Sequence, residues 1–434
     1  MLRHLLPGLL VAVAASGQTT PRAFVGAHLY PITGPPIENG TLVIHNGKIV
    51  ALGPAAEVPV PAAAVRHDAS DSVILPGFVD THSHVGSVEG GDGSGPMHPD
   101  ARALDSINVR DARVQKAQAG GITTANIMPG SGHLLSGQTL YVKYRDSKVI
   151  DDLLIRRADG ALAYGVKMAN GTNSRKDPPF PGTRAKSAAM VRERFLAAIE
   201  YQDEVARAAD RGERLPPRDL GLETLGEILA GERTVHFHTH RHDDILTILR
   251  LAGEFGFKVV LQHVSDGWAV ADQIAVSPHV VGASLILIDS PGGKLEAKDN
   301  QFATGGILER AGVVTGFHTD DSITDSRLFN RMAALAVRAG MSRSGALYGL
   351  TMAGARMLGL EDRIGSLEPG KDADLAVLSG DPLSVYTQVL QTWVDGEKVF
   401  DRVDPQDRLY AEGGFGASHD QGQHQHGIVE GEYR

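Results

Sequence analysis

Strand-like and helical runs alternate along this chain from about residue 75 to residue 360. The apolar residues at 245, 248, 249, 252 and 255 recur at helical spacing and predict a helix over 243–255. Seven other runs have the apolar, β-branched character of buried strands: 73–85, 123–128, 161–168, 234–238, 258–263, 283–288 and 313–317. Repeated β-then-α units of this length predict an α/β fold of the (β/α)8 TIM barrel type. An eighth strand is expected within 140–154, and a doubly wound sheet is the alternative.

Short β-like segments lie on both sides of this alternating region. His45-Asn46-Gly47-Lys48 is a strong hairpin signal near the beginning, and Asp395-Gly396 marks a second tight turn near the end. Neither β-unit could bury an apolar face alone, so we expect the two to pair as a small composite β-sandwich built from both chain ends. The expected boundaries are 18–74 and 363–408 for the β-sandwich and 75–362 for the barrel.

The two extremities of the chain have their own patterns. Residues 1–17 combine a basic start, an apolar run and small residues at Ala15-Ser16-Gly17, which is the layout of a cleavable signal peptide and predicts a periplasmic or secreted protein. A buried N-terminal strand or an uncleaved anchor is the alternative. The segment 409–434 is rich in glycine and histidine (His419, His424, His426) and is expected to be a flexible tail rather than a lid or an extra metal site.

Composition and charge limit the classes of molecule that this protein is expected to bind. The formal charge of −10 is spread along the chain without long blocks of one sign, so neither nucleic acid nor an anionic membrane is the expected partner. A small-molecule substrate fits better, and homo-oligomerisation is left open. The chain has no cysteine, so a disulfide framework or a thiolate metal site is excluded and any metal must use histidine, carboxylate or lysine-derived ligands.

Histidines and one aspartate fall at the ends of the predicted strands. His82 and His84 are two residues apart, so on a strand both imidazoles face the same side. His238 and His263 end two strands that are separated by one predicted helix, and Asp320 follows a later strand. In a TIM barrel the catalytic residues lie at the C-terminal ends of the strands, so we expect these side chains to converge on a divalent metal site.

Several runs resemble the amidohydrolase superfamily, near its imidazolonepropionase-like and prolidase-like branch. The runs are Leu75-Pro-Gly-Phe-Val-Asp-Thr-His82-Ser-His84, Val235-His-Phe-His238-Thr-His-Arg, Leu261-Gln-His263, His318-Thr-Asp320 and Gly365-Ser-Leu-Glu-Pro-Gly370-Lys-Asp-Ala-Asp374-Leu-Ala-Val-Leu378. The resemblance covers nearly all of the chain after residue 17. It implies a metal-dependent hydrolase acting on carbon–nitrogen bonds.

The resemblance also implies a ligand set. His82, His84 and Asp320 would hold one divalent ion, expected to be zinc, and His238 and His263 a second one. Lys167 would be carboxylated so that its carbamate bridges the two ions, because an unmodified ammonium has only donors. The alternative is a single ion with Lys167 paired to a carboxylate. The run after Lys167, Met-Ala-Asn-Gly-Thr, departs from the Ala-Thr-Gly-Gly of prolidase-like members.

Roles for the remaining polar residues follow from this mechanism. The metal would activate a water, and Asp320 would accept its proton and pass it to the leaving nitrogen, with Asp321 as the less favoured candidate. His240, Arg241 and His133 are candidates for substrate binding. Arg241 could clamp a substrate carboxylate or could simply pair with Asp243 or Asp244.

The expected reaction is hydrolysis of an amide or cyclic-amide bond in a small molecule. A one-metal deaminase is the alternative among enzymes. A non-catalytic binding protein that kept the barrel is a third reading, and the presence of all six expected ligands in the sequence disfavours it.

Overall fold

The computed structural model describes residues 20–86, 88, 90–287, 294–321 and 323–413. The predicted signal peptide and the histidines of the predicted tail lie outside these residues. Among the described residues, no helix combines the length and the apolarity that crossing a bilayer would require.

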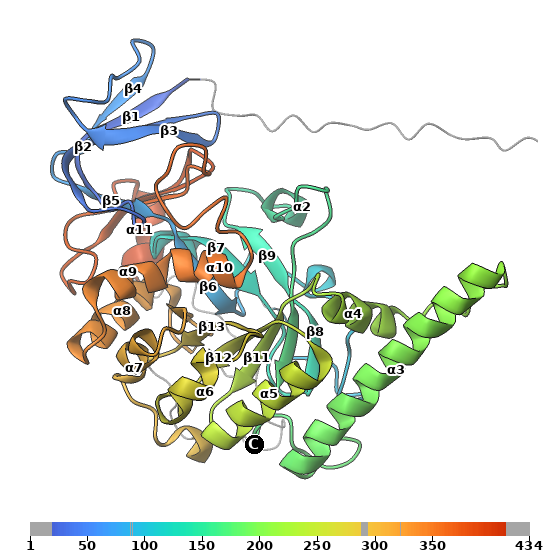
Figure 1. Cartoon of the computed structure of the whole chain (residues 1–434). Helices are drawn as coiled ribbons and strands as arrows, with labels where there is room; N and C mark the ends of the chain where they lie inside the picture. The colour runs from blue at the N-terminus through green and yellow to red at the C-terminus, as the bar shows by residue number, and fades with distance from the viewer. Residues whose placement is uncertain (1–19, 87, 89, 288–293, 322, 414–434) are drawn as a thin grey trace, which may run out of the picture.

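One sheet takes its strands from both ends of the described chain (Figure 1). Its order is β17-β16-β15-β5-β1-β2-β3, with β4 on β1, and β15 runs antiparallel to β5. The strands are β1 (Arg22–Leu29), β2 (Ile37–His45), β3 (Lys48–Pro54), β4 (Val65–Asp68), β5 (Val73–Pro76), β15 (Leu375–Leu378), β16 (Val389–Val394) and β17 (Glu397–Asp401). This end sheet has its own apolar cluster, in which Trp393 meets Phe24 edge-on at 5.3 Å between ring centroids.

Both predicted hairpins of the end sheet form. Asn46 and Gly47, between β2 and β3, have φ of 51° and 73°, and Asp395 and Gly396, between β16 and β17, have φ of 49° and 77°. Two successive left-handed residues are what the tight turn between twisted antiparallel strands requires, and Asn-Gly and Asp-Gly tolerate that conformation best.

A six-stranded sheet carries most of the alternating region, in the order β14-β13-β12-β11-β10-β8. Its strands are β8 (Leu135–Gln138), β10 (Val166–Ala169), β11 (Val235–Thr239), β12 (Val259–His263), β13 (Val280–Leu285) and β14 (Thr315–Phe317). From β10 to β14 all pairs are parallel. The connections contain α3 (Arg184–Arg211), α4 (Leu220–Leu229), α5 (His242–Phe255), α6 (Ala271–Ala275) and α7 (Thr304–Arg310), so the predicted β-then-α repeat is present here.

A three-stranded sheet holds β6 (Phe78–Ser83), β7 (Ile122–Ile127) and β9 (Leu140–Lys143), with α1 (Arg113–Ala119) before β7. The predicted eighth strand therefore exists as β9, but it runs antiparallel to β7, whereas a β-then-α repeat requires a parallel one. The short chain between β7 and β9 leaves no room for a crossover helix, so an antiparallel return is the accessible geometry. β8 also pairs antiparallel, with β10.

The run predicted as one strand over 73–85 is divided at Gly77. Residues before it belong to the end sheet as β5, and residues after it start β6. A Cβ on Gly77 would overlap the side chain of Thr123, so only glycine lets the chain pass this close to β7. The break places His82 and His84 on a different sheet from β5.

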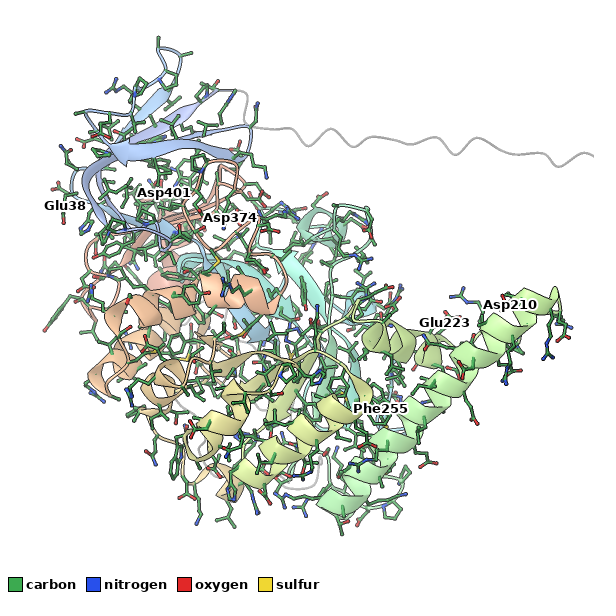
Figure 2. The ribbon with its side chains drawn as sticks, viewed as in Figure 1. Glu38, Asp210, Glu223, Phe255, Asp374 and Asp401 are labelled. Atoms are coloured by element: carbon green, nitrogen blue, oxygen red, sulfur yellow. The ribbon has the colours of Figure 1, made fainter. Side chains whose placement is uncertain are left out.

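The remaining helices cover the outside: α2 (Ile150–Leu153), α8 (Phe329–Arg338), α9 (Arg343–Leu350), α10 (Met352–Met357) and α11 (Pro405–Glu412). The long helix α3 extends beyond the rest of the molecule, and Asp210 lies near its far end (Figures 1 and 2). Its inner half is anchored by Phe195, which stacks on Phe257 at 5.4 Å and lies 5.1 Å from Phe255 of α5.

Buried charges join the end sheet to the three-stranded sheet. Nζ of Lys143, at the end of β9, lies 2.7 Å from Asp372 and 3.0 Å from Asp374 and also pairs with Asp395. Figure 2 shows Asp374 between the end sheet and the rest of the molecule. Burial alone would lower the pKa of Lys143, but the three carboxylates raise it to about 12. The ammonium is therefore charged, and it holds three acids that would otherwise repel one another.

Candidate metal centre

The C-terminal ends of four strands bring the predicted ligands together. His82 lies on β6 and His84 just after it, His238 on β11, His263 at the end of β12, and Asp320 after β14. Each of these residues is at most 3% exposed. Parallel strands with right-handed connections place their C-terminal ends at one edge, which is why residues this far apart in the sequence meet here.

His82, His84 and Asp320 form a compact group whose ligand atoms lie within 4.8 Å of one another. Oδ1 of Asp320 lies 2.8 Å from Nε2 of His84 and 3.2 Å from Nε2 of His82. Nδ1 of His84 lies 2.7 Å from the carbonyl oxygen of Met128, so it donates its proton there and turns Nε2 toward Asp320. Such an outer hydrogen bond is typical of a metal-binding histidine.

His263 belongs to two further groups of the same compactness. One contains His238 and His240, and the other contains His82 and His318. Nδ1 of His240 lies 2.8 Å from Oγ of Ser265, and Nδ1 of His318 lies 2.9 Å from Oγ of Ser284. The structure therefore gathers six imidazoles and Asp320 in three groups that are linked through His82 and His263.

Burial sets the protonation of these imidazoles. It lowers the pKa of His82, His238 and His263 well below the ordinary value, and it lowers that of His318 to about 3. A neutral imidazole has a lone pair for a metal ion, whereas an imidazolium has none. Near neutral pH these four side chains are therefore in their ligand form.

Lys167 lies on β10 and is fully buried beside the first group. Its Nζ is 2.9 Å from Nε2 of His82 and 3.2 Å from Sδ of Met128. Burial lowers its pKa from 10.5 to about 7. The structure thus places Lys167 in contact with His82 of the first group.

The two neighbouring aspartates face different surroundings. Asp320 has a left-handed φ of 50°, as does His263 with 72°, and this backbone turns Asp320 into the centre. Oδ2 of Asp321 accepts hydrogen bonds from the backbone nitrogen (3.0 Å) and Oγ (2.7 Å) of Ser326. Asp321 therefore holds the following loop, and Asp320 is the acid that meets the histidines.

Asp80 is a positioning residue that the sequence analysis missed. Its carboxylate accepts hydrogen bonds from the backbone nitrogen (3.1 Å) and Oγ1 (2.5 Å) of Thr319 and from the backbone nitrogen of His82 (3.2 Å). Together with the bond from Asp320 N to His82 O (2.9 Å), it fastens β6 to the segment after β14. Burial raises the pKa of Asp80 to about 7.

The predicted substrate-binding residues are placed apart from these groups, except for His240. The guanidinium of Arg241 makes two hydrogen bonds with the carboxylate of Asp243, at 2.9 and 2.8 Å. His133 is buried against Phe180, with ring centroids 5.1 Å apart, and burial lowers its pKa to about 4. Of the two readings of Arg241, the structure forms the ion pair.

His240 and His318 are candidate ligands to which the sequence analysis assigned no metal role. The signal was present in both cases. His240 follows His238 by two positions and His318 precedes Asp320 by two, so the rule that placed His82 and His84 on one side of a strand applies to both.

The donor set fits a divalent transition metal. Imidazole nitrogens and a carboxylate are the ligands that Zn²⁺ and its neighbours take when no thiolate is present. Nε2 of His263 is buried without a hydrogen-bond partner among the described residues, and a buried polar atom normally has one. A cation among these nitrogens would satisfy it.

Comparison with known proteins supports this reading. Residues 183–400 match the model of the Amidohydrolase family. An amidohydrolase from Thermotoga maritima of known structure is 32% identical, covers 88% of this chain over its own full length, and superposes with a TM-score of 0.80. The imidazolonepropionase of Xanthomonas oryzae is 25% identical over 79% of this chain and 87% of its own length.

A longer relative, the amidohydrolase tasK of Hapsidospora irregularis, is 27% identical over 83% of this chain. The match spans only 40% of the length of that protein. The chain belongs to the amidohydrolase family. It is accordingly an enzyme of the class that acts on carbon–nitrogen bonds.

Proposed function

We propose that this enzyme hydrolyses an amide or cyclic-amide bond in a small molecule such as a dipeptide, an N-acyl amino acid or a lactam. The observation that carries the proposal is the buried contact of Asp320 with His82 and His84. It supplies two imidazoles and a carboxylate at one point. A divalent ion held there supplies a water activated near neutral pH and polarises the scissile carbonyl.

The residues of the chain divide the remaining work. The carboxylate of Asp320 accepts the proton of the attacking water and delivers it to the leaving nitrogen, so one group serves as base and then as acid. Asp80 and Thr319 hold Asp320 and His82 in place through the hydrogen bonds between β6 and the segment after β14. Arg241 and His133 are proposed as substrate contacts outside the three buried groups.

Metal identity and count form a second part of the proposal. Zinc is the favoured ion because histidine and carboxylate ligands suit it. Two ions are proposed because the group of His82, His84 and Asp320 shares no residue with the group of His238, His240 and His263. We propose that Lys167 adds to carbon dioxide through Nζ and loses a proton, giving a carbamate that bridges the ions. What supports this is the buried position of Nζ beside His82.

We interpret the six-stranded and three-stranded sheets as one (β/α)8 barrel over 75–362, and the end sheet as a composite β-sandwich of 18–74 and 363–408. The backbone hydrogen bonds from Asp320 to His82 (2.9 Å) and from His84 to Asp321 (3.2 Å) support closure on one side. The separate apolar cluster around Trp393 supports a distinct β-domain.

Export to the periplasm or the medium is also a proposal. It rests on the basic, apolar and small-residue pattern of residues 1–17. N-terminal sequencing of the protein recovered from its own cells tests it, and an intact N-terminus in the cytoplasmic fraction would refute it.

The deciding experiment is a screen of dipeptides, N-acyl amino acids and lactams against the zinc-loaded enzyme and its Asp320→Asn variant. Hydrolysis by the wild type that the variant lacks supports the proposal. A one-metal deaminase remains the competing function, because His82, His84 and Asp320 alone could hold a single ion. Release of ammonia from amino-purines or amino-pyrimidines, with one ion bound and no amide cleaved, would favour the deaminase.

A further inference from the structure

His238, His240 and His263 form a cluster of three imidazoles from two neighbouring strands. Their ring centroids are 4.7 Å apart for His238 and His240, 4.1 Å for His238 and His263, and 5.0 Å for His240 and His263. One ligand atom from each lies within 4.8 Å of the others. Three side chains at this spacing can meet at one ion with metal–nitrogen bonds of about 2 Å.

The orientation of His240 is held from outside the cluster. Oγ of Ser265 lies 2.8 Å from Nδ1 of His240, which leaves Nε2 to face the cluster. The backbone keeps the two strand ends in register, since Val264 N donates to Thr239 O and Asp266 N donates to His240 O, both at 2.9 Å. The three imidazoles therefore belong to one rigid framework.

His240 shares the burial of the other two imidazoles. The residue is 3% exposed, as is His263, and His238 is 0% exposed. Its ring lies 4.7 Å from that of His238 and 5.0 Å from that of His263, so it is as well placed as they are to meet an ion between the strand ends. A neutral imidazole has one lone pair that it can give to a cation.

We propose that His238, His240 and His263 form a three-imidazole seat for the second divalent ion, with His240 as a true ligand. The inference rests on the proposed two-metal function and deepens it. The seat holds its ion through this chain's own side chains, whether or not Lys167 carries a carbamate. Borderline ions such as Zn²⁺ and Co²⁺ suit three imidazoles best.

The test compares His240→Ala with His242→Ala in the full-length protein. His242 lies two positions further on, and its side chain is 54% exposed, so it is a matched control. Each protein is loaded with Zn²⁺ or Co²⁺, dialysed and analysed for metal content, and the visible absorption of the bound Co²⁺ is recorded. We expect two ions in the wild type and in His242→Ala, and one ion in His240→Ala with one Co²⁺ band set lost.

A second variant keeps the test decisive if His240→Ala does not fold. Ser265→Ala leaves all three imidazoles but frees the ring of His240, and its dissociation constant for the second ion should rise about 10-fold to 100-fold. Two ions with an unchanged Co²⁺ spectrum in His240→Ala, unchanged affinity in Ser265→Ala, or a single ion in the wild type would each overturn the proposal. Two ions in a wild type that cleaves no amide would refute the proposed function and leave the seat standing.

Discussion

Nε2 of His84, just after β6, lies 2.8 Å from Oδ1 of Asp320, just after β14. The two residues come from opposite ends of the strand series that runs from β6 to β14. The contact exists because hydrogen bonds through Asp80, Thr319 and the backbone of His82 fasten those two strand ends together. The centre and the fold are therefore formed by the same contacts.

Replacing Asp320 by asparagine should nearly abolish activity. The amide keeps the shape of the side chain but cannot accept the proton of water and is a weak ligand, so we expect kcat to fall about 10³-fold or more. Asp299→Asn, at a side chain that is 54% exposed, is the control and should behave as the wild type. A variant at position 320 with more than about a tenth of the wild-type kcat would contradict the assigned role.

Lys167→Ala tests the carbamate separately from the seat. We expect kcat to fall about 100-fold, because the bridging group and its positioning of the water are lost. The metal content should remain at two ions, since the seat does not need Lys167. Partial recovery of activity with added formate or propionate would show that a carboxylate is the missing group. A fully active variant would refute the bridge.

Removal of metal should destabilise the folded protein as well as inactivate it. Bound ions stabilise the buried imidazoles that hold them. An ion that binds only the folded state, at a free concentration of about 1,000 times its Kd, adds roughly 4 kcal/mol to the free energy of unfolding. Treatment with a chelator should therefore lower the Tm measured by calorimetry, and added Zn²⁺ should restore both Tm and activity. An unchanged Tm in a protein shown to be metal-free would argue against ions at this centre.

Lys143→Met should destabilise the junction between the end sheet and the three-stranded sheet. It leaves Asp372, Asp374 and Asp395 without their shared buried cation, and breaking such a network costs about 3–5 kcal/mol. Lys48 also pairs with Asp372, but its side chain is 47% exposed, so Lys48→Met should cost under about 1 kcal/mol. Urea unfolding curves measure both variants, and equal costs would show that burial of Lys143 is not what matters.

Asp325 should make part of the stability depend on acid pH. Burial alone would raise its pKa, but hydrogen bonds from Arg327 and Lys116 lower it from 3.8 to about 2. Because the folded state binds this proton less readily, the ionised carboxylate stabilises the protein fully above about pH 4, and the contribution is lost as the pH falls toward 2. Asp325→Asn should cost roughly 1 kcal/mol near pH 7, a value reduced for partial exposure.

The measurement for Asp325 is the difference between wild-type and variant urea midpoints as the pH is lowered. We expect that difference to shrink only in the acid range. A difference that stays constant down to about pH 3 would assign the effect to packing and not to charge.

Local signals in the sequence determined much of this protein. The Asn46-Gly47 and Asp395-Gly396 turns formed because those residues accept left-handed backbone whatever surrounds them. The helix predicted over 243–255 is α5, which begins only one residue earlier. The alternation of residues along a strand was enough to nominate His82 and His84, and the strand ends nominated His238, His263 and Asp320.

Only the tertiary structure decided the direction of β9 and which side chains meet at the candidate metal centre. Strand direction depends on the length of the connection and on which edge is open, and neither is a property of the strand's own residues. Likewise the spacing of His240 and His318 put each on the same side of its strand as a predicted ligand, but only the packing of the strands brings both rings next to His263. Whether a side chain becomes a ligand depends on distances between strand ends, and those distances are set by packing across the whole chain.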